Sequence, residues 1–236
     1  MVEDAELSNL AVVVAGTTSV PTNDSLELGS GATLEVVSDG TLAVGNSSQV
    51  TNDGSGEKAQ INFGGVLKYT GSSSGDFSDI EVPITIDGAV DVSTATLRFD
   101  TGGVLGSTAS AATTGSGSAS IESTFTPGVS GGALSGFTID DGTLEGVQGA
   151  GPFTVPSGQT ATMLDTNVTG ATLDNAGTLV IGANNTDSLQ SGSQLDNTGT
   201  LEFGIGSTLN DDSDANGDLL TNESTGTMEF LSLIHI

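Results

Sequence analysis

Residues 173–182 read LDNAGTLVIG, and the same pattern returns at residues 195–204 as LDNTGTLEFG. A third copy, LTNESTGTMEF, occupies residues 220–230 and has two extra residues before its glycine. The glycines of the first two copies, Gly177 and Gly199, are 22 positions apart (199 minus 177). Internal similarity at a period of roughly 20–50 residues is typical of stacked supersecondary units rather than of one globular core. We therefore expect a repeat architecture.

Pairs of apolar residues spaced two apart predict the strands of this repeat. Period-two spacing places both members of a pair on one face of a β-strand, and here the intervening positions carry Thr, Glu, Asp or small side chains. Each strand is therefore expected to be half buried. The pairs are Leu26/Leu28, Leu34/Val36, Leu42/Val44, Leu67/Tyr69, Ile84/Ile86, Val90/Val92, Leu97/Phe99, Phe137/Ile139, Phe153/Val155, Leu179/Ile181, Leu201/Phe203 and Met228/Phe230.

A glycine precedes many of these pairs, and its spacing extends the repeat toward the N-terminus. Gly40 and Gly65 are 25 residues apart, and Gly65 and Gly88 are 23 apart. We expect each such glycine to provide a corner with positive φ, which residues with a Cβ resist. The asparagine that precedes the glycine in the three late copies is expected to stack from turn to turn as a hydrogen-bonded ladder, or to serve only as a turn former.

These features predict an all-β fold, a single right-handed parallel β-helix (β-solenoid) with about 22–25 residues per coil. The right-handed sense rests on the general preference of parallel crossover connections. An array of β-sandwiches is the alternative, but 22 residues are too few for an immunoglobulin-like unit.

One solenoid is expected over residues 1–230, with an irregular, small-residue segment near residues 106–136. Residues 231–236, LSLIHI, fall outside the repeat and resemble translated adapter sequence at the ends of metagenomic reading frames; a genuine final strand is the alternative. We expect the chain to be a fragment of a longer protein.

Charge excludes several classes of partner. Three Lys and Arg residues stand against 30 Asp and Glu residues, for a formal net charge of −27. Such a chain is repelled by nucleic acid and by anionic membranes, and screening by salt or calcium would relieve its self-repulsion.

There is no cysteine, so disulfides and thiol chemistry are excluded, and no apolar run suggests insertion into a membrane.

A stretch of alternating acids near the C-terminus predicts a calcium site. Residues 212–223 read DSDANGDLLTNE and match the twelve-residue EF-hand loop, with oxygen donors at positions 1, 3 and 5, Gly at 6 and Glu at 12. The flanking sequence predicts strands rather than helices, so any calcium would be structural. An acidic turn without an ion is the alternative. The candidate ligands are Asp212, Asp214, Asn216, Asp218 and Glu223.

No catalytic constellation is specific. The chain has a single His, within residues 231–236, so a Ser-His-Asp triad or a His-ligated zinc site lacks its partner. Carboxylate pairs such as Asp140/Asp141 and Asp211/Asp212 carry little information in so acidic a chain. Arg98 is the only guanidinium, and its place in an alternating strand predicts an outward position.

The segments GTLEG (142–146), FTVPSG (153–158) and LDNAGTL (173–179) resemble the degenerate coils of bacterial surface proteins, the filamentous haemagglutinin-like adhesins and autotransporter passenger domains. The resemblance implies a non-catalytic structural or adhesive segment, extracellular or on the bacterial cell surface, that contacts host-cell, matrix or polysaccharide surfaces. A polysaccharide-active enzyme of pectate-lyase-like architecture is the alternative. Open ends of the stack would also permit end-to-end self-association.

Overall fold

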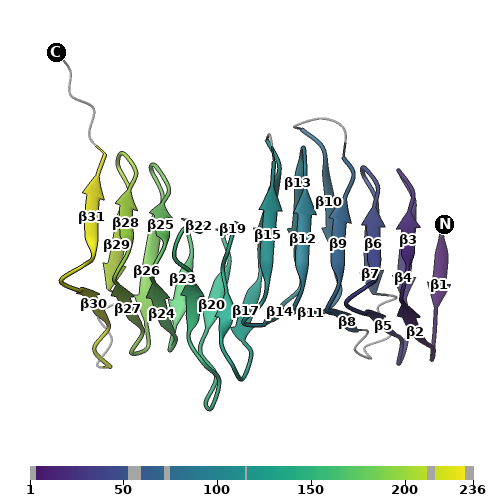
Figure 1. Ribbon diagram of the computed structural model, residues 1–236, viewed down its shortest axis with the longest axis horizontal. Helices are drawn as coiled ribbons and strands as arrows, with labels where there is room; N and C mark the ends of the chain where they lie inside the picture. Colours follow the sequence, from purple (N-terminus) through teal and green to yellow (C-terminus); the bar gives the residue numbers. More distant parts are fainter. Residues whose placement is uncertain (1–3, 53–59, 72–74, 115, 212–215, 232–236) are drawn as a thin grey trace.

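The computed structural model describes residues 4–52, 60–71, 75–114, 116–211 and 216–231. All regular structure in these ranges is β-strand, and Figure 1 shows the turns stacked along the long axis, with β1 and β31 at opposite ends of the stack. Every strand-to-strand ladder is parallel. The chain is therefore a parallel β-solenoid, as its repeat predicts. None of the described segments forms a helix long and apolar enough to span a membrane.

Three strands make each turn, so strands three elements apart in the chain pair with each other. Sheet A has 11 described strands: β1 (Ala5–Leu7), β4 (Ser25–Leu28), β7 (Gln49–Asn52), β10 (Phe77–Ile80), β13 (Thr96–Phe99), β16 (Ser118–Ile121), β19 (Phe137–Asp140), β22 (Thr160–Leu164), β25 (Thr178–Ile181), β28 (Thr200–Phe203) and β31 (Thr227–Phe230). Sheet B has ten: β2 (Ala11–Val14), β5 (Thr33–Val36), β8 (Gln60–Phe63), β11 (Ile84–Ile86), β14 (Gly103–Leu105), β17 (Thr124–Pro127), β20 (Thr143–Glu145), β23 (Asn167–Thr169), β26 (Thr186–Gln190) and β29 (Thr208–Asp211).

The third face is divided into two sheets. The first contains β3 (Thr17–Val20), β6 (Thr41–Val44), β9 (Val66–Tyr69), β12 (Ala89–Val92) and β15 (Ser110–Thr113). The second contains β18 (Gly132–Ala133), β21 (Phe153–Val155), β24 (Thr172–Asn175), β27 (Gln194–Asn197) and β30 (Leu219–Asn222). A single bridge, Ser110 to Ser135, joins them. The division falls within residues 106–136, while β16 and β17 carry sheets A and B through the same region.

The inward columns follow the period-two pairs of the sequence. Both members of almost every pair are buried, and the register stacks Leu179 on Leu201 and Ile181 on Phe203. The last two described turns depart: Phe203 and Met228 are only partly buried, and Phe230 is 68% exposed because no further described turn covers it. The prediction of inward columns is confirmed except at this end.

Aromatic rings fill the core where the third face is divided. The ring centroids of Phe99 and Phe125 are 6.2 Å apart with the rings nearly perpendicular, and those of Phe99 and Phe137 are 6.4 Å apart. All three side chains are buried. These rings replace the packing that the small residues of segment 106–136 cannot provide.

The expected role of the glycines before the strands is wrong. Gly40, Gly88 and Gly199 do not have positive φ; the glycines with positive φ lie elsewhere. A Cβ at Gly40 would overlap the carbonyl oxygen of Val14, and one at Gly199 would overlap that of Gly177. These glycines are therefore required by the close approach of the preceding turn rather than by backbone conformation.

The asparagine ladder is confirmed. Asn175 Nδ2 donates to Asn197 Oδ1 at 2.7 Å, and Asn197 Nδ2 donates to Asn222 Oδ1 at 2.6 Å. Each amide also donates to a carbonyl of the next turn, that of Thr200 at 2.7 Å or of Thr227 at 3.0 Å. Asn175 and Asn197 are buried, so these bonds satisfy amide N–H groups that water does not reach, while Asn175 Oδ1 has no hydrogen-bond partner among the described residues.

Candidate functional site

A hollow of about 430 Å³ crosses the outward face of sheet A over β10, β13, β16, β19 and β22. Two smaller hollows adjoin it. One, of about 230 Å³, lies beside residues 47–49 and shares Phe77; the other, of about 160 Å³, shares Ser118, Thr138 and Thr162. Together they make a strip from β7 to β22, which we call the sheet A groove.

Strand alternation and register build the floor of this groove. Because Leu97 and Phe99 point into the core, their neighbours Thr96 and Arg98 point outward. The same alternation holds in the neighbouring strands, and the register sets equivalent positions side by side from turn to turn. The row across the middle of the groove is Asp79, Arg98, Ser120, Thr138 and Thr162.

Arg98 is the one cation that lines the groove, and it is held in place. Its Nε donates to Asp79 Oδ1 at 2.7 Å, and its guanidinium carbon lies 3.9 Å from the ring centroid of Phe77. A weaker ion pair joins Nη1 to Glu122 Oε2 at 3.9 Å. The hydrogen bond with Asp79 raises the pKa of Arg98 above its usual value. The expected outward position of Arg98 is confirmed.

The carboxylates of the groove are partly desolvated. Burial raises the pKa of Glu122 above its usual range, although the Ser120 hydroxyl and the Arg98 charge oppose the rise. Burial also raises the pKa of Asp140, and the charges of Asp141 and Asp165 add to this effect. Partly buried carboxylates near one another favour a cationic partner, because a positive charge relieves both desolvation and mutual repulsion.

A cluster of three carboxylates lies at the C-terminal ends of β10 and β13, with Asp79 in β10 and Glu81 and Asp100 just after the two strands. Oxygens of Asp79, Glu81 and Asp100 lie within 4.8 Å of one another. Burial raises the pKa of Asp100, the charge of Asp79 raises it further, and Arg98 opposes the rise. Since Arg98 already donates to Asp79, part of the charge of this cluster is balanced within the protein.

The predicted calcium ligands are only partly placed. Asp212 and Asp214 lie outside the described residues, while Asn216 is exposed. Asp218 Oδ1 accepts a hydrogen bond from the Ser193 backbone N–H at 2.7 Å. Strand β30 separates Asp218 from Glu223, so the structure sets these two at opposite ends of an extended segment rather than around one centre. Calcium binding by the loop stays a prediction.

The carboxylate pairs singled out in the sequence do not form catalytic pairs among the described residues, and the single tyrosine is buried. Asp140 lines the groove, whereas Asp141 is exposed in a turn with a φ of 54°. Asp211 ends β29, and its neighbour Asp212 is outside the described residues. Tyr69, the single tyrosine, is buried and donates its hydroxyl to Asn46 Oδ1 at 3.0 Å.

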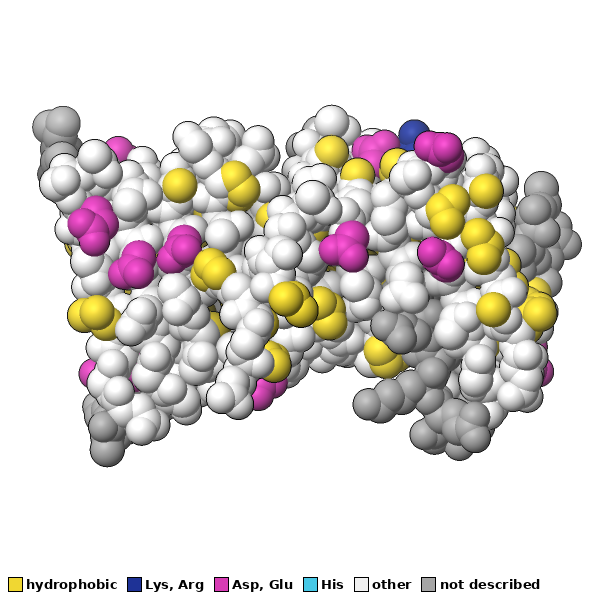
Figure 2. Space-filling view, turned by 60° about the horizontal axis from the view of Figure 1, so that its bottom comes forward, with side chains coloured by type: hydrophobic (Ala, Val, Ile, Leu, Met, Phe, Trp, Pro, Cys, Tyr) yellow, Lys and Arg dark blue, Asp and Glu magenta, His cyan; other side chains and the backbone are white. Residues whose placement is uncertain are grey.

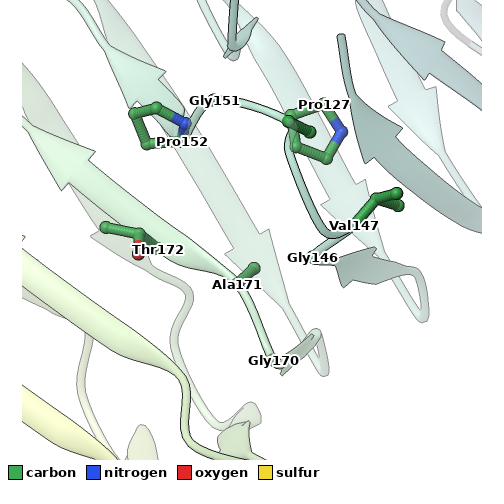
Figure 3. A pocket seen from close by; sticks show the side chains of 9 residues that line it. Pro127, Gly146, Val147, Gly151, Pro152, Gly170, Ala171 and Thr172 are labelled. Carbon is green, nitrogen blue, oxygen red and sulfur yellow. The ribbon is translucent and has the colours of Figure 1, made fainter. Parts of the chain in front are cut away.

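A separate hollow, of about 260 Å³, lies at the corner where β17, β20 and β23 of sheet B lead into β18, β21 and β24 (Figure 3). Its lining residues are small or apolar, and Pro127, Val147 and Pro152 stand around it in the figure. Val147 is 50% exposed. Without a charged or acidic side chain in its lining, this hollow offers no chemistry comparable to that of the groove.

Figure 2 shows acidic side chains spread along the solenoid, with dark blue confined to a small area. Lys68, on β9, is exposed, and its Nζ lies 3.6 Å from Asp91 Oδ2. The excess of acidic over basic side chains on this face agrees with the net charge of −27.

No protein-family model matches the chain, and no curated protein matches it. Among solved structures it is similar to the crystal structure of a TibC-catalyzed hyper-glycosylated TibA55-350 fragment, with 16% sequence identity over 94% of this chain and 99% of that chain. The TM-score is 0.25, too low for the two folds to be equated. Nothing about TibA is therefore transferred to this chain.

Sequence reasoning missed the groove because it followed the inward residues. Phe77 belongs to no apolar pair with period two, and it is 48% exposed at the edge of the groove. A search for inward residues therefore passes over it. The signal that could have found the site is the outward row, since Asp79, Arg98 and Ser120 recur at nearly the coil spacing. Reading outward positions turn by turn would have shown hydroxyls beside one arginine.

Proposed function

We propose that this chain is a non-catalytic structural or adhesive segment of a secreted bacterial surface protein. The observation that supports this most is the continuity of sheets A and B from the first described turns to the last. A stack held by unbroken parallel ladders is stiff and elongated, which suits a stalk or a repetitive surface. Its acidic surface keeps such segments apart and available to other partners.

A polysaccharide-active enzyme is the second candidate, and the sheet A groove favours it. Glu122 and Asp140 have raised pKa values and lie in a hollow with a guanidinium, a combination that active sites also use. Against catalysis, Arg98 donates to Asp79 and lies over the Phe77 ring. Its positive charge is therefore already paired within the protein rather than available to a substrate.

Binding and cleavage assays on one panel of surfaces separate the two candidates. The purified chain is incubated with chitin, chitosan, cellulose, pectate and a matrix-protein coating, and both the retained chain and newly formed sugar ends are measured. We expect retention on at least one surface with no cleavage. Cleavage that disappears in Arg98→Ala would establish the enzyme, and retention on none of the surfaces would contradict the adhesive role.

A further inference from the structure

We propose that the sheet A groove binds a linear polysaccharide whose sugars carry free amino groups, an inference that rests on the proposed adhesive function and names its ligand. The site is built from side chains of successive turns rather than from a loop. Its shape, its hydroxyl groups, its charge and its exposed ring each restrict the ligand.

The shape of the groove fits a chain rather than a small molecule. It extends over six adjacent strands of sheet A, from β7 to β22. Five steps at ~4.8 Å each make it roughly 24 Å long, parallel to the solenoid axis. A polymer lying along the axis passes one turn after another, so each turn can offer it an equivalent set of groups.

The floor of the groove is rich in hydroxyl groups. Thr96, Ser118, Thr138 and Thr162 line its main part, whereas the Ser120 hydroxyl beneath them is buried. Hydroxyls both donate and accept hydrogen bonds, which matches the hydroxyls of a sugar chain. The β-strands fix the side chains, so little conformational entropy is lost when a ligand binds.

The charge of the groove selects among sugar polymers. Asp76, Glu122 and Asp140 line it, while Arg98 is its one cation and donates to Asp79. A uronic-acid or sulfated polymer would be repelled by these carboxylates and by the net charge of −27. Amino sugars in their ammonium form bring the complementary charge together with hydroxyls, so this class fits best.

Phe77 provides the apolar element. Its side chain is about half exposed, at the point where the main hollow meets the one beside residues 47–49. Arg98 lies against the ring and fixes it. A rigid, exposed ring in a polar groove gives the apolar face of a sugar ring a surface to contact.

Fluorescence anisotropy with a labelled glucosamine hexamer, in low-salt buffer just below neutral pH, tests the proposal. We expect the hexamer to bind, and the double variant Glu122→Gln/Asp140→Asn to bind at least tenfold more weakly. Phe77→Ala should weaken binding as well. The matched control is Glu202→Gln/Glu229→Gln, which removes the same charge from outward positions of β28 and β31, outside the groove, and should bind as the parent does.

Two competitors separate amino-sugar recognition from simple charge attraction. An N-acetylglucosamine hexamer, which lacks the charge, and spermine, which lacks the sugar, should each compete at least tenfold less well than the unlabelled glucosamine hexamer. Equal binding by the two double variants, or competition by spermine as strong as by the hexamer, would overturn the proposal. Retention of the chain on a matrix-protein coating alone would also overturn it, while leaving the adhesive function standing.

Discussion

Replacing Leu179 by Asn should lower the free energy of unfolding by about 3–5 kcal/mol, because it removes a buried side chain and places an amide in the core. Leu179 is fully buried in β25 and stacks between Ala161 and Leu201 of the neighbouring turns. The backbone ladders cannot move apart to admit water without breaking several turns. Chemical denaturation followed by circular dichroism measures the effect.

The neighbouring residue provides the control. Val180 lies in the same strand but points outward, so Val180→Asn makes a similar change of β-propensity without touching the core. We expect it to cost no more than about 0.5 kcal/mol. Equal losses at the two positions would mean that the assigned faces of sheet A are wrong.

Lowering the pH from about 7 to about 4 should stabilise the protein, and Asp187 should account for much of the gain. Asp187 is fully buried at an inward position of β26, and burial raises its pKa to about 6. Its Oδ1 accepts a hydrogen bond from the Thr166 backbone N–H at 2.7 Å, while Oδ2 makes no hydrogen bond to the described residues. The folded state therefore favours the protonated acid.

The sign of this dependence follows from the raised pKa. The unfolded chain releases the proton near its ordinary pKa of 3.8, so folded stability is greatest below that value and falls as pH rises toward 6. A difference of about two pKa units corresponds to about 3 kcal/mol. Asp100, Glu122, Asp140 and Asp174 also have raised pKa values and add to the effect in the same direction.

Thermal melts over a pH series check the prediction. Asp187→Asn keeps an oxygen acceptor for Thr166 but removes the charge, so its Tm should exceed that of the parent at pH 7 and vary less between pH 4 and pH 6. The control is Asp39→Asn at an exposed turn, and its Tm should vary with pH as that of the parent does. A parent protein that loses stability steadily from pH 7 to pH 4 would contradict the assignment of Asp187 to the core.

The fold could be predicted from the sequence because inward positions obey strict physical rules. Leucine pairs spaced two apart and copies spaced 22 apart leave few other ways to bury the apolar side chains. The asparagine ladder followed from the same spacing. The role of Gly199 was mistaken because the sequence indicates only that a Cβ is absent, whereas the carbonyl of Gly177 that excludes it belongs to another turn.

The candidate site could not be predicted because it depends on residues far apart in the sequence. Phe77 and Arg98 meet only once the register of β10 against β13 is known. Asp187 occupies a position that alternation alone would assign to an apolar residue, and nothing local marks it as buried. The surroundings of outward residues, and of a buried acid such as Asp187, are set by neighbours on other turns. A single sequence does not specify which residues those neighbours are.

The central claim, a parallel solenoid with equivalent residues stacked turn on turn, is tested most directly by engineered disulfides, because the chain has no cysteine of its own. Outward threonines form a column on sheet A, in which Thr160 pairs with Thr178, Thr178 with Thr200, and Thr200 with Thr227. Neighbouring strands bring such pairs to about 4.8 Å between Cα atoms, within the range of a disulfide.

Double cysteine variants at each of these three pairs should form an intramolecular disulfide on mild oxidation, detected by mass spectrometry of the monomer. A cysteine pair at Thr160 and Thr200, two turns apart, should not. Cross-linking at all three adjacent pairs and none at the skipped pair is the result that a stacked parallel solenoid requires. Failure of the adjacent pairs, or equally efficient cross-linking of the skipped pair, would contradict it.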